Sequence, residues 1–198
     1  MEKERTTEIT KNTTENRQNK EGFGLKQQLW EFAKFFLIAA LIVVPIRLWI
    51  AQPFIVNGAS MVPSFEHGEY LIIDEFSYHF RAPERGEVIV FRYPIDPSKF
   101  FIKRVIGLPK ERLDISNDEI KVYNEKFPGG VTINESYLEK ELPTANMSVA
   151  LGENEYFVLG DNRQMSSDSR VWGTLPADLI IGRAWIRLWP FTKLSISF

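Results

Sequence analysis

The feature that most constrains this chain is one apolar segment, LWEFAKFFLIAALIVVPIRLWIAQPFIV, at residues 29–56. Its uncharged run, residues 35–46, would span only about 18 Å as a helix, against roughly 30 Å for the hydrocarbon core of a bilayer. Lys34 and Arg47 flank this run, and both side chains are long enough to reach lipid headgroups. Residues 29–51 therefore predict a single membrane-spanning helix.

Two tryptophans favour the same interpretation. Trp30 and Trp49 lie near the ends of the segment, where interfacial aromatic residues are common in membrane helices. A helix buried in a protein core is one alternative. A cleavable signal peptide is another, although the segment is long for one and no small-x-small cleavage site closely follows it.

The positions of the basic residues predict the orientation. Lys20, Lys26 and Lys34 lie on the N-terminal side, whereas Arg47 is followed by no further lysine or arginine until Arg81. The positive-inside rule then puts the N-terminus in the cytoplasm and the rest of the chain outside the plasma membrane.

Three parts are therefore expected. Residues 1–27 are polar and predict a disordered cytoplasmic tail. Residues 28–52 predict the anchor, and residues 53–198 one compact extracytoplasmic domain.

The composition gives no indication of nucleic-acid binding, because the net charge is −2 and no basic patch dominates. The chain has no cysteine, which excludes disulfides and cysteine nucleophiles, and its two histidines cannot form a three-histidine metal site.

The third part shows the pattern of an all-β domain with little helix. Six segments rich in β-branched and aromatic residues are separated by turn residues: YLIID (70–74), EVIVFRY (87–93), FFIKRVIG (100–107), EIKVYN (119–124), EYFVLG (155–160) and LIIGRAWIRLW (179–189).

Ser60 lies in a tight turn just after the apolar segment. Gly58 permits close backbone approach, Ala59 keeps the approach open, and Pro63 stiffens the exit. Such a serine can act as a nucleophile whose own N–H stabilises an oxyanion. Most serines in glycine-rich turns are only turn residues, so both interpretations stay open.

Lys103 and Arg104 point to opposite faces of their strand, and apolar residues lie on both faces. One of the two cations must therefore face an apolar layer, and only lysine can lose its charge there. Burial can lower a lysine pKa from about 10.4 toward about 7–8, which gives a neutral amine able to take a proton from a serine. The alternative is an edge-strand lysine that reaches solvent.

The densest polar stretch is GDNRQMSSDSRVWG at residues 160–173. Ser166, Asp168 and Arg170 alternate along it and would share a face in an extended run. Asp168 and Arg170 can pair, and Ser166 can hydrogen-bond a neighbouring amine; a solvated loop is the alternative. His67 and His79 show no partner spacing and are expected to be surface or hydrogen-bonded residues.

Together, these segments resemble the type I signal peptidases, membrane-anchored Ser-Lys proteases that remove signal peptides from exported proteins. The family motifs appear in family order as SMVPS (60–64), GEVIVF (86–91), KRVIGLP (103–109) and GDNRQMSSDSRVWG (160–173). The resemblance covers residues 29–190. Self-cleaving Ser-Lys repressors share the dyad, but they carry a DNA-binding head and no anchor, so residues 29–51 argue against them.

The resemblance implies roles for individual residues. Ser60 matches the nucleophile, Lys103 the general base, Ser166 the hydroxyl that orients the lysine, and Asp168 and Arg170 a supporting ion pair. The backbone N–H of Ser60 would donate to the oxyanion.

Position 58 and the length of the chain resemble the short Gram-positive form. Many Gram-negative members carry a serine at position 58 as a second oxyanion donor, whereas this chain has Gly58. The segment between Pro109 and Gly160 is short, so the large second subdomain of some Gram-negative members is expected to be absent.

The resemblance further implies a coiled, barrel-like antiparallel β fold that binds its substrate as an added strand. Six matching positions are candidates for shallow pockets that accept small side chains: Phe54, Val56, Met61, Phe65, Phe101 and Ile102. The implied partners are signal peptides of secreted preproteins, the lipid bilayer and a nearby secretion translocon, with no metal or cofactor. The alternative is a catalytically inactive, membrane-anchored peptide-binding module; loss of Ser60 or Lys103 would be its signature, and both are present.

Overall fold

The computed structural model describes residues 24, 26–41, 43–44, 51–116, 119–138 and 146–196. The chain divides into two compact units, Met1–Leu48 and Trp49–Phe198. The described residues of the first unit are helical and expose several large apolar side chains. Among the described residues, no helix combines the length and the apolar character needed to cross a membrane. Residues 1–23 of the predicted tail and 45–50 of the predicted anchor lie outside the described residues.

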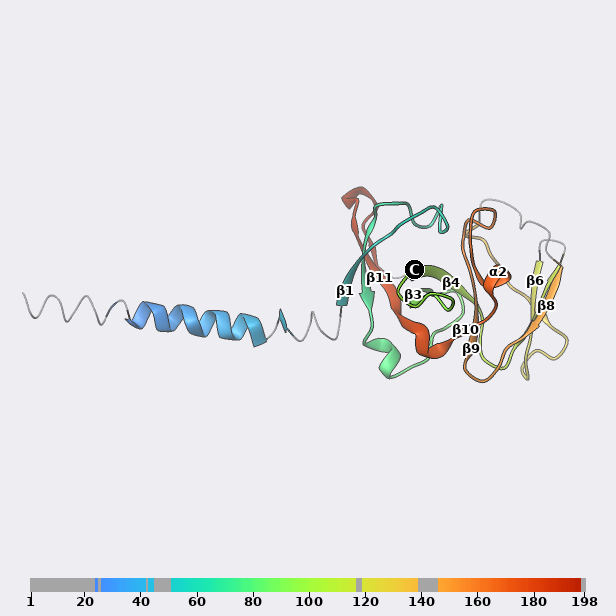
Figure 1. Ribbon diagram of the computed structural model, residues 1–198, viewed down its shortest axis with the longest axis horizontal. Helices are drawn as coiled ribbons and strands as arrows, with labels where there is room; N and C mark the ends of the chain where they lie inside the picture. Colours follow the sequence, from blue (N-terminus) through green and yellow to red (C-terminus); the bar gives the residue numbers. More distant parts are fainter. Residues whose placement is uncertain are drawn as a thin grey trace, which may run out of the picture. The chain divides into compact units, whose positions relative to one another are not determined.

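The second unit is built from antiparallel strands in two sheets (Figure 1). The larger sheet has the order β1 (Ala51–Ile55), β2 (Tyr70–Asp74), β11 (Ile180–Trp189), β3 (Val88–Arg92), β4 (Phe100–Gly107), β9 (Glu155–Leu159) and β10 (Leu175–Pro176), and β12 (Ser195–Ile196) pairs with β11. Figure 1 shows β1 and β11 at one side of this unit and β6 and β8 at the opposite side.

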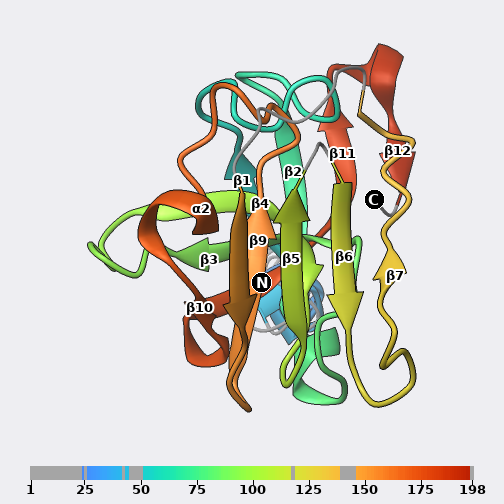
Figure 2. The ribbon, with the colours of Figure 1, turned by 90° about the vertical axis from the view of Figure 1, so that its right-hand side faces the viewer.

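The segment between Pro109 and Gly160 supplies the smaller sheet. Its order is β7 (Val131–Thr132), β6 (Glu119–Tyr123), β5 (Arg112–Ser116) and β8 (Met147–Ala150). Figure 2 shows β5, β6 and β7 side by side at the front of the unit. The described helices of this unit are single turns: η2 (Ser77–His79), α2 (Ser169–Trp172), η3 (Ala177–Leu179) and η4 (Phe191–Lys193).

The predicted mainly β fold is confirmed, and all six predicted strands form with ends shifted by no more than one residue. The strands that the sequence did not reveal are β1, β5, β7, β8, β10 and β12. β1 also contains Ala51 and Gln52, which the prediction assigned to the anchor, because these residues pair with Asp74 and Ile73 of β2.

β4 and β9 lie inside the fold, because apolar residues cover both faces of each strand. Val105 of β4 packs with Val158 of β9 in one hydrophobic cluster, whereas Ile106 packs with Phe157 against the smaller sheet. Every β4 residue from Ile102 onward is buried. The fold therefore carries the Lys-Arg pair of this strand on an interior element.

Candidate active site

Ser60 and Lys103 meet at the surface of the larger sheet. Lys103 Nζ lies 2.7 Å from Ser60 Oγ, at hydrogen-bond distance, and donates a second bond to the carbonyl oxygen of Ile102 at 2.8 Å. Ser60 comes from the loop between β1 and β2, and Lys103 from the buried part of β4. The structure thus brings together two groups that are 43 residues apart in sequence.

The Lys103 amine is kept away from water. The residue is 3% exposed, and Nζ lies 5.3 Å from the centroid of the Phe101 ring. Burial lowers the pKa of Lys103 to about 8, although the negative charges of Asp168 and Asp161 oppose this shift. Desolvation dominates because a charged ammonium loses more hydration energy than these carboxylates return.

The backbone around Ser60 is held by the turn that follows β9. The carbonyl of Ser60 accepts a hydrogen bond from the N–H of Asn162 at 3.0 Å. A Cβ on Gly160 would clash with both this carbonyl and Ser166 Oγ. Only glycine therefore allows the turn to lie so close to Ser60.

Gly58 adopts φ = 99°, in the left-handed region that favours glycine. Its N–H donates to Nδ1 of His67 at 3.2 Å. His67 is exposed, as expected, and this bond links it to the turn that leads into Ser60.

Asp168 and Arg170 form the predicted ion pair, but not along an extended run: Asp168 caps the helical turn α2, in which Arg170 lies. Arg170 Nε and Nη2 each lie 2.8 Å from an oxygen of Asp168, which is fully buried and also accepts from the N–H of Gly160. Ser166 Oγ is buried but finds no hydrogen-bond partner among the residues that the structure describes. The expected bond between Ser166 and Lys103 is therefore not formed in this structure, in which Lys103 Nζ bonds Ser60 and Ile102.

An open groove of about 470 Å³ leads to the dyad. Its lining residues are Phe54, Asn57, Gly58, Ala59, Ser60, Lys99, Phe100, Phe101, Ile102, Lys103, Met165 and Ser167. Phe54, Phe101 and Ile102 were among the predicted pocket positions. The other three, Val56, Met61 and Phe65, are buried in a hydrophobic cluster and are not among the residues that line this groove. Met165, which is 71% exposed, was not predicted.

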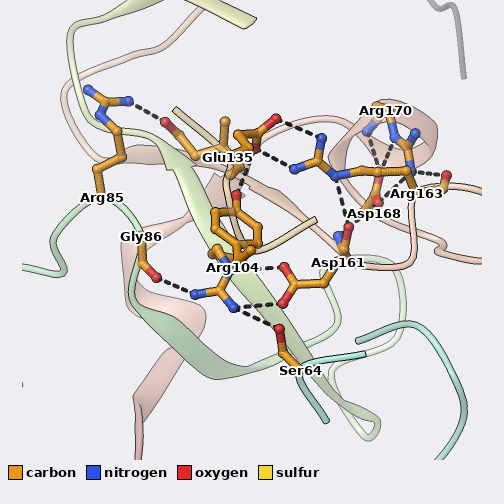
Figure 3. A network of polar contacts seen from close by, with 12 residues as sticks. Ser64, Arg85, Gly86, Arg104, Glu135, Asp161, Arg163, Asp168 and Arg170 are labelled. Carbon is orange, nitrogen blue, oxygen red and sulfur yellow. Dashed lines mark hydrogen bonds and ion pairs between the residues drawn. The ribbon is translucent and has the colours of Figure 1, made fainter. Parts of the chain in front are cut away.

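Arg104 is buried as well, so both cations of the pair lie inside the fold. The prediction required only one of them to face an apolar layer. Arg104 remains charged there because Asp161 accepts two hydrogen bonds from its guanidinium, at 2.9 Å and 2.6 Å (Figure 3). Further bonds reach the carbonyl of Gly86 and the hydroxyl of Ser64. Asp161 belongs to the polar stretch at residues 160–173 that the sequence singled out, but no sequence pattern linked it to Arg104.

Arg163 has a buried acidic partner that the sequence did not indicate. Its guanidinium forms a two-point ion pair with Glu135, a residue of the smaller-sheet segment (Figure 3). Among the described residues, no group of three or more His, Asp or Glu side chains is arranged to hold a metal ion.

Comparison with known proteins places this arrangement in a family. The family model described as "Signal peptidase, peptidase S26" matches residues 29–189. Probable signal peptidase I-1 of Synechocystis sp. is 34% identical over 176 residues, 83% of this chain and 86% of the relative. Signal peptidase IB of Staphylococcus aureus is 32% identical over 186 residues, 88% of this chain and 96% of the relative. A crystal structure of a signal peptidase I from Enterococcus faecalis is 29% identical with a TM-score of 0.45, over 52% of this chain and 97% of that chain.

The family model covers well over half of the chain, and both curated relatives exceed 30% identity across most of their length. The chain therefore belongs to the peptidase S26 family of signal peptidases, and it is a serine endopeptidase that cleaves signal peptides.

Proposed function

We propose that Ser60 is the nucleophile and Lys103 the general base with which this signal peptidase cleaves its substrates. The observation that carries the assignment is the 2.7 Å contact between Ser60 Oγ and an amine that is 3% exposed. A dry amine with a pKa of about 8 is neutral often enough near neutral pH to accept the serine proton.

The reaction then follows from these two groups. Ser60 Oγ attacks the scissile carbonyl carbon while its proton moves to Nζ of Lys103. The resulting lysinium protonates the leaving amine as the C–N bond breaks, which leaves an ester between Ser60 and the signal peptide. Water attacks this ester with Lys103 again as base, and the products are a free carboxylate and regenerated Ser60.

The oxyanion formed in each addition step needs hydrogen-bond donors. The N–H of Ser60 makes no hydrogen bond within the part of the chain that the structure describes, so it is available for this role. The N–H of Gly58 is engaged by His67, and Gly58 has no side chain to offer.

Ser166, Asp168 and Arg170 are proposed as supporting residues. Asp168 holds Gly160 and Arg170 together and keeps the turn against the carbonyl of Ser60. Ser166 Oγ has unused hydrogen-bonding capacity beside this turn. We assign it to orient the amine once Lys103 has taken the proton and turned away from Ser60.

The substrate is proposed to bind as an extended strand along β4. The stretch Phe100–Lys103 pairs with β3 on one side, whereas β9 pairs only with the later part of β4, from Arg104 onward. The other edge of Phe100–Lys103 is therefore unpaired among the described residues, and it borders the groove. A peptide strand added there would present its backbone to β4 and its alternate side chains to Phe54 and Ile102.

We further propose that the chain is a single-pass plasma-membrane protein with residues 1–27 in the cytoplasm, an anchor that starts at residue 28 and ends before β1 begins at Ala51, and the catalytic unit outside. The support is the apolar segment with its flanking charges, and large apolar side chains that stay exposed along residues 29–44. The end of the catalytic unit offers a second apolar surface: Leu188, Trp189, Phe191, Leu194 and Ile196 are exposed. Aromatic residues of this kind favour the lipid interface, where signal peptides leave the bilayer and the translocon is close.

The dyad is tested by cleavage of a signal-peptide-bearing preprotein with Ser60→Ala and Lys103→Met variants. Both are expected to lose cleavage by at least about a thousandfold. Ser148→Ala and Lys121→Met, exposed positions on the smaller sheet, are matched controls and should cleave normally. Cleavage that survives in either dyad variant removes that residue from the mechanism.

The membrane anchor is tested separately: extraction of the full chain from membranes by alkaline carbonate would contradict it.

A further inference from the structure

The ion pair between Glu135 and Arg163 joins the smaller sheet to the turn that holds the nucleophile. Glu135 follows β7, and its segment is tied to β6 by a hydrogen bond from the N–H of Ile133 to the carbonyl of Ile120. Arg163 Nη1 donates to Glu135 Oε2 at 3.0 Å, and Nη2 donates to Oε1. The Glu135 side chain is 11% exposed and the Arg163 side chain 2%, so the pair is shielded from solvent and salt.

The guanidinium of Arg163 also fixes the backbone of the turn. Its Nε donates to the carbonyl of Gly160 at 3.0 Å, and its own carbonyl accepts from Arg170 Nη2 at 2.8 Å. Asn162, the residue before Arg163, donates its N–H to the carbonyl of Ser60. A displacement of Arg163 would therefore move the group that positions the nucleophile.

A second set of contacts leads from Glu135 to the lysine. The hydroxyl of Tyr137 donates to Glu135 Oε1 at 2.7 Å, and the Arg104 guanidinium lies 4.2 Å from the centroid of the Tyr137 ring. Arg104 is the neighbour of Lys103 on β4. Glu135 is thus linked indirectly to both members of the dyad, to Ser60 through Arg163 and its turn, and to Lys103 through Tyr137 and Arg104.

We propose that Glu135 is a positioning residue of the signal peptidase reaction, which sets the distance between Ser60 and Lys103 from outside the groove. The proposal rests on the assignment of these two residues as the dyad. Removing the carboxylate leaves the Arg163 guanidinium buried without its counter-charge, so the side chain must move toward water and take the turn with it. A shift of about 1 Å in a reacting group can cost about a hundredfold in rate.

The test compares Glu135→Gln with the unaltered full chain in detergent micelles, with a synthetic peptide that spans a signal-peptide cleavage site as substrate. We expect kcat to fall about 10- to 100-fold. We expect KM to change by less than about twofold, since neither Glu135 nor Arg163 lines the groove. Tyr137→Phe keeps the ring on Arg104 but removes its bond to Glu135, and should lower kcat by about 3- to 10-fold.

Glu111→Gln is the matched control. Glu111 is likewise shielded and paired with an arginine: Arg85 Nη2 donates to both of its oxygens, and its other bonds go to Leu108 and Asn124 and not to the Ser60 turn. A similar loss of thermal stability in both glutamine variants, with kcat lowered only by Glu135→Gln, supports the proposal. Two results overturn the proposal. One is that kcat falls equally in Glu135→Gln and Glu111→Gln, in proportion to their loss of thermal stability. The other is that kcat is unchanged in Glu135→Gln. If Glu135→Gln does not fold, an unchanged kcat in Tyr137→Phe overturns it instead.

Ser60→Ala in the same assay keeps two failures distinct. Cleavage by Ser60→Ala removes the dyad assignment itself. Loss of cleavage in Ser60→Ala together with normal kcat in Glu135→Gln and Tyr137→Phe leaves the dyad intact and removes only the positioning role.

Discussion

The burial of Lys103 predicts the pH dependence of cleavage. Because the free enzyme must hold this amine in its neutral form, kcat/KM should follow the neutral fraction of Lys103. With a pKa of about 8, that fraction is about 9% at pH 7, about 50% at pH 8 and about 91% at pH 9. The expected kcat/KM therefore rises about tenfold between pH 7 and pH 9 and then levels off.

The assay is cleavage of a peptide without titratable side chains near the scissile bond, measured from pH 6 to pH 10.5 at constant ionic strength. An amine in water, with its ordinary pKa near 10.4, would give a rise of about a hundredfold over the same interval and no plateau below about pH 10. A continued tenfold rise per pH unit above pH 9 would show that the amine is solvated. A flat profile from pH 6 to pH 9 would show that Lys103 is not the base.

The same shift makes stability depend on pH. The pKa of Lys103 falls from 10.5 to about 8 on folding, so between these values the unfolded chain binds more protons and the free energy of unfolding rises with pH. Below about pH 8 the buried amine is protonated in the folded state, and holding this charge away from water lowers the free energy of unfolding by about 3 kcal/mol. Lys103→Met lacks this cost, and chemical denaturation at pH 7 should find it more stable by up to about 3 kcal/mol. The result would contradict the burial of this amine if Lys103→Met were less stable than the unaltered protein at pH 7 and the two free energies of unfolding did not converge at pH 10.5.

Two further predictions concern the turn beside Ser60. Gly160→Ala should abolish cleavage and lower the free energy of unfolding by about 1–3 kcal/mol, because the added Cβ has no room beside Ser60. Gly129→Ala is the control, since a Cβ there meets no other atom. Equal cleavage by the two variants would refute the close approach of Gly160 to Ser60. Asp161→Asn should cost about 3–5 kcal/mol in denaturant titrations, because it leaves Arg104 buried without a counter-charge. Asp114→Asn, which weakens an ion pair at a more exposed position, should cost less than about 1 kcal/mol; similar losses in both would argue against the burial of Arg104.

The sequence was informative where local pattern and chemistry coincide. The strand FFIKRVIG was predicted with its observed ends, and alternation along it predicted that Lys103 or Arg104 must face an apolar layer. β7, β10 and β12 have only two residues each, too few for a period to appear, and pairing with neighbours is what makes them strands.

The polar contacts around the dyad were harder to foresee. Arg104 finds Asp161 57 residues away, and Arg163 finds Glu135 28 residues back in the chain. Such pairings depend on which strands the fold makes adjacent, and no sequence spacing encodes that. The resemblance offered Val56 and Ile102 alike as pocket positions, and only Ile102 lines the groove, because both are apolar and the path of the chain decides which one borders open space.

The place of β11 in the larger sheet makes the meeting of Ser60 and Lys103 depend on this strand. β1 and β2 flank the loop that carries Ser60, β4 carries Lys103, and β11 pairs with both β2 and β3, the partner of β4. Because β11 follows β2, β3 and β4 in the chain, the two halves of the sheet lack their bridging partner until this strand has been synthesised and paired. A chain cut short before β11 is therefore expected to leave the hydroxyl and the amine unassembled and to cleave nothing.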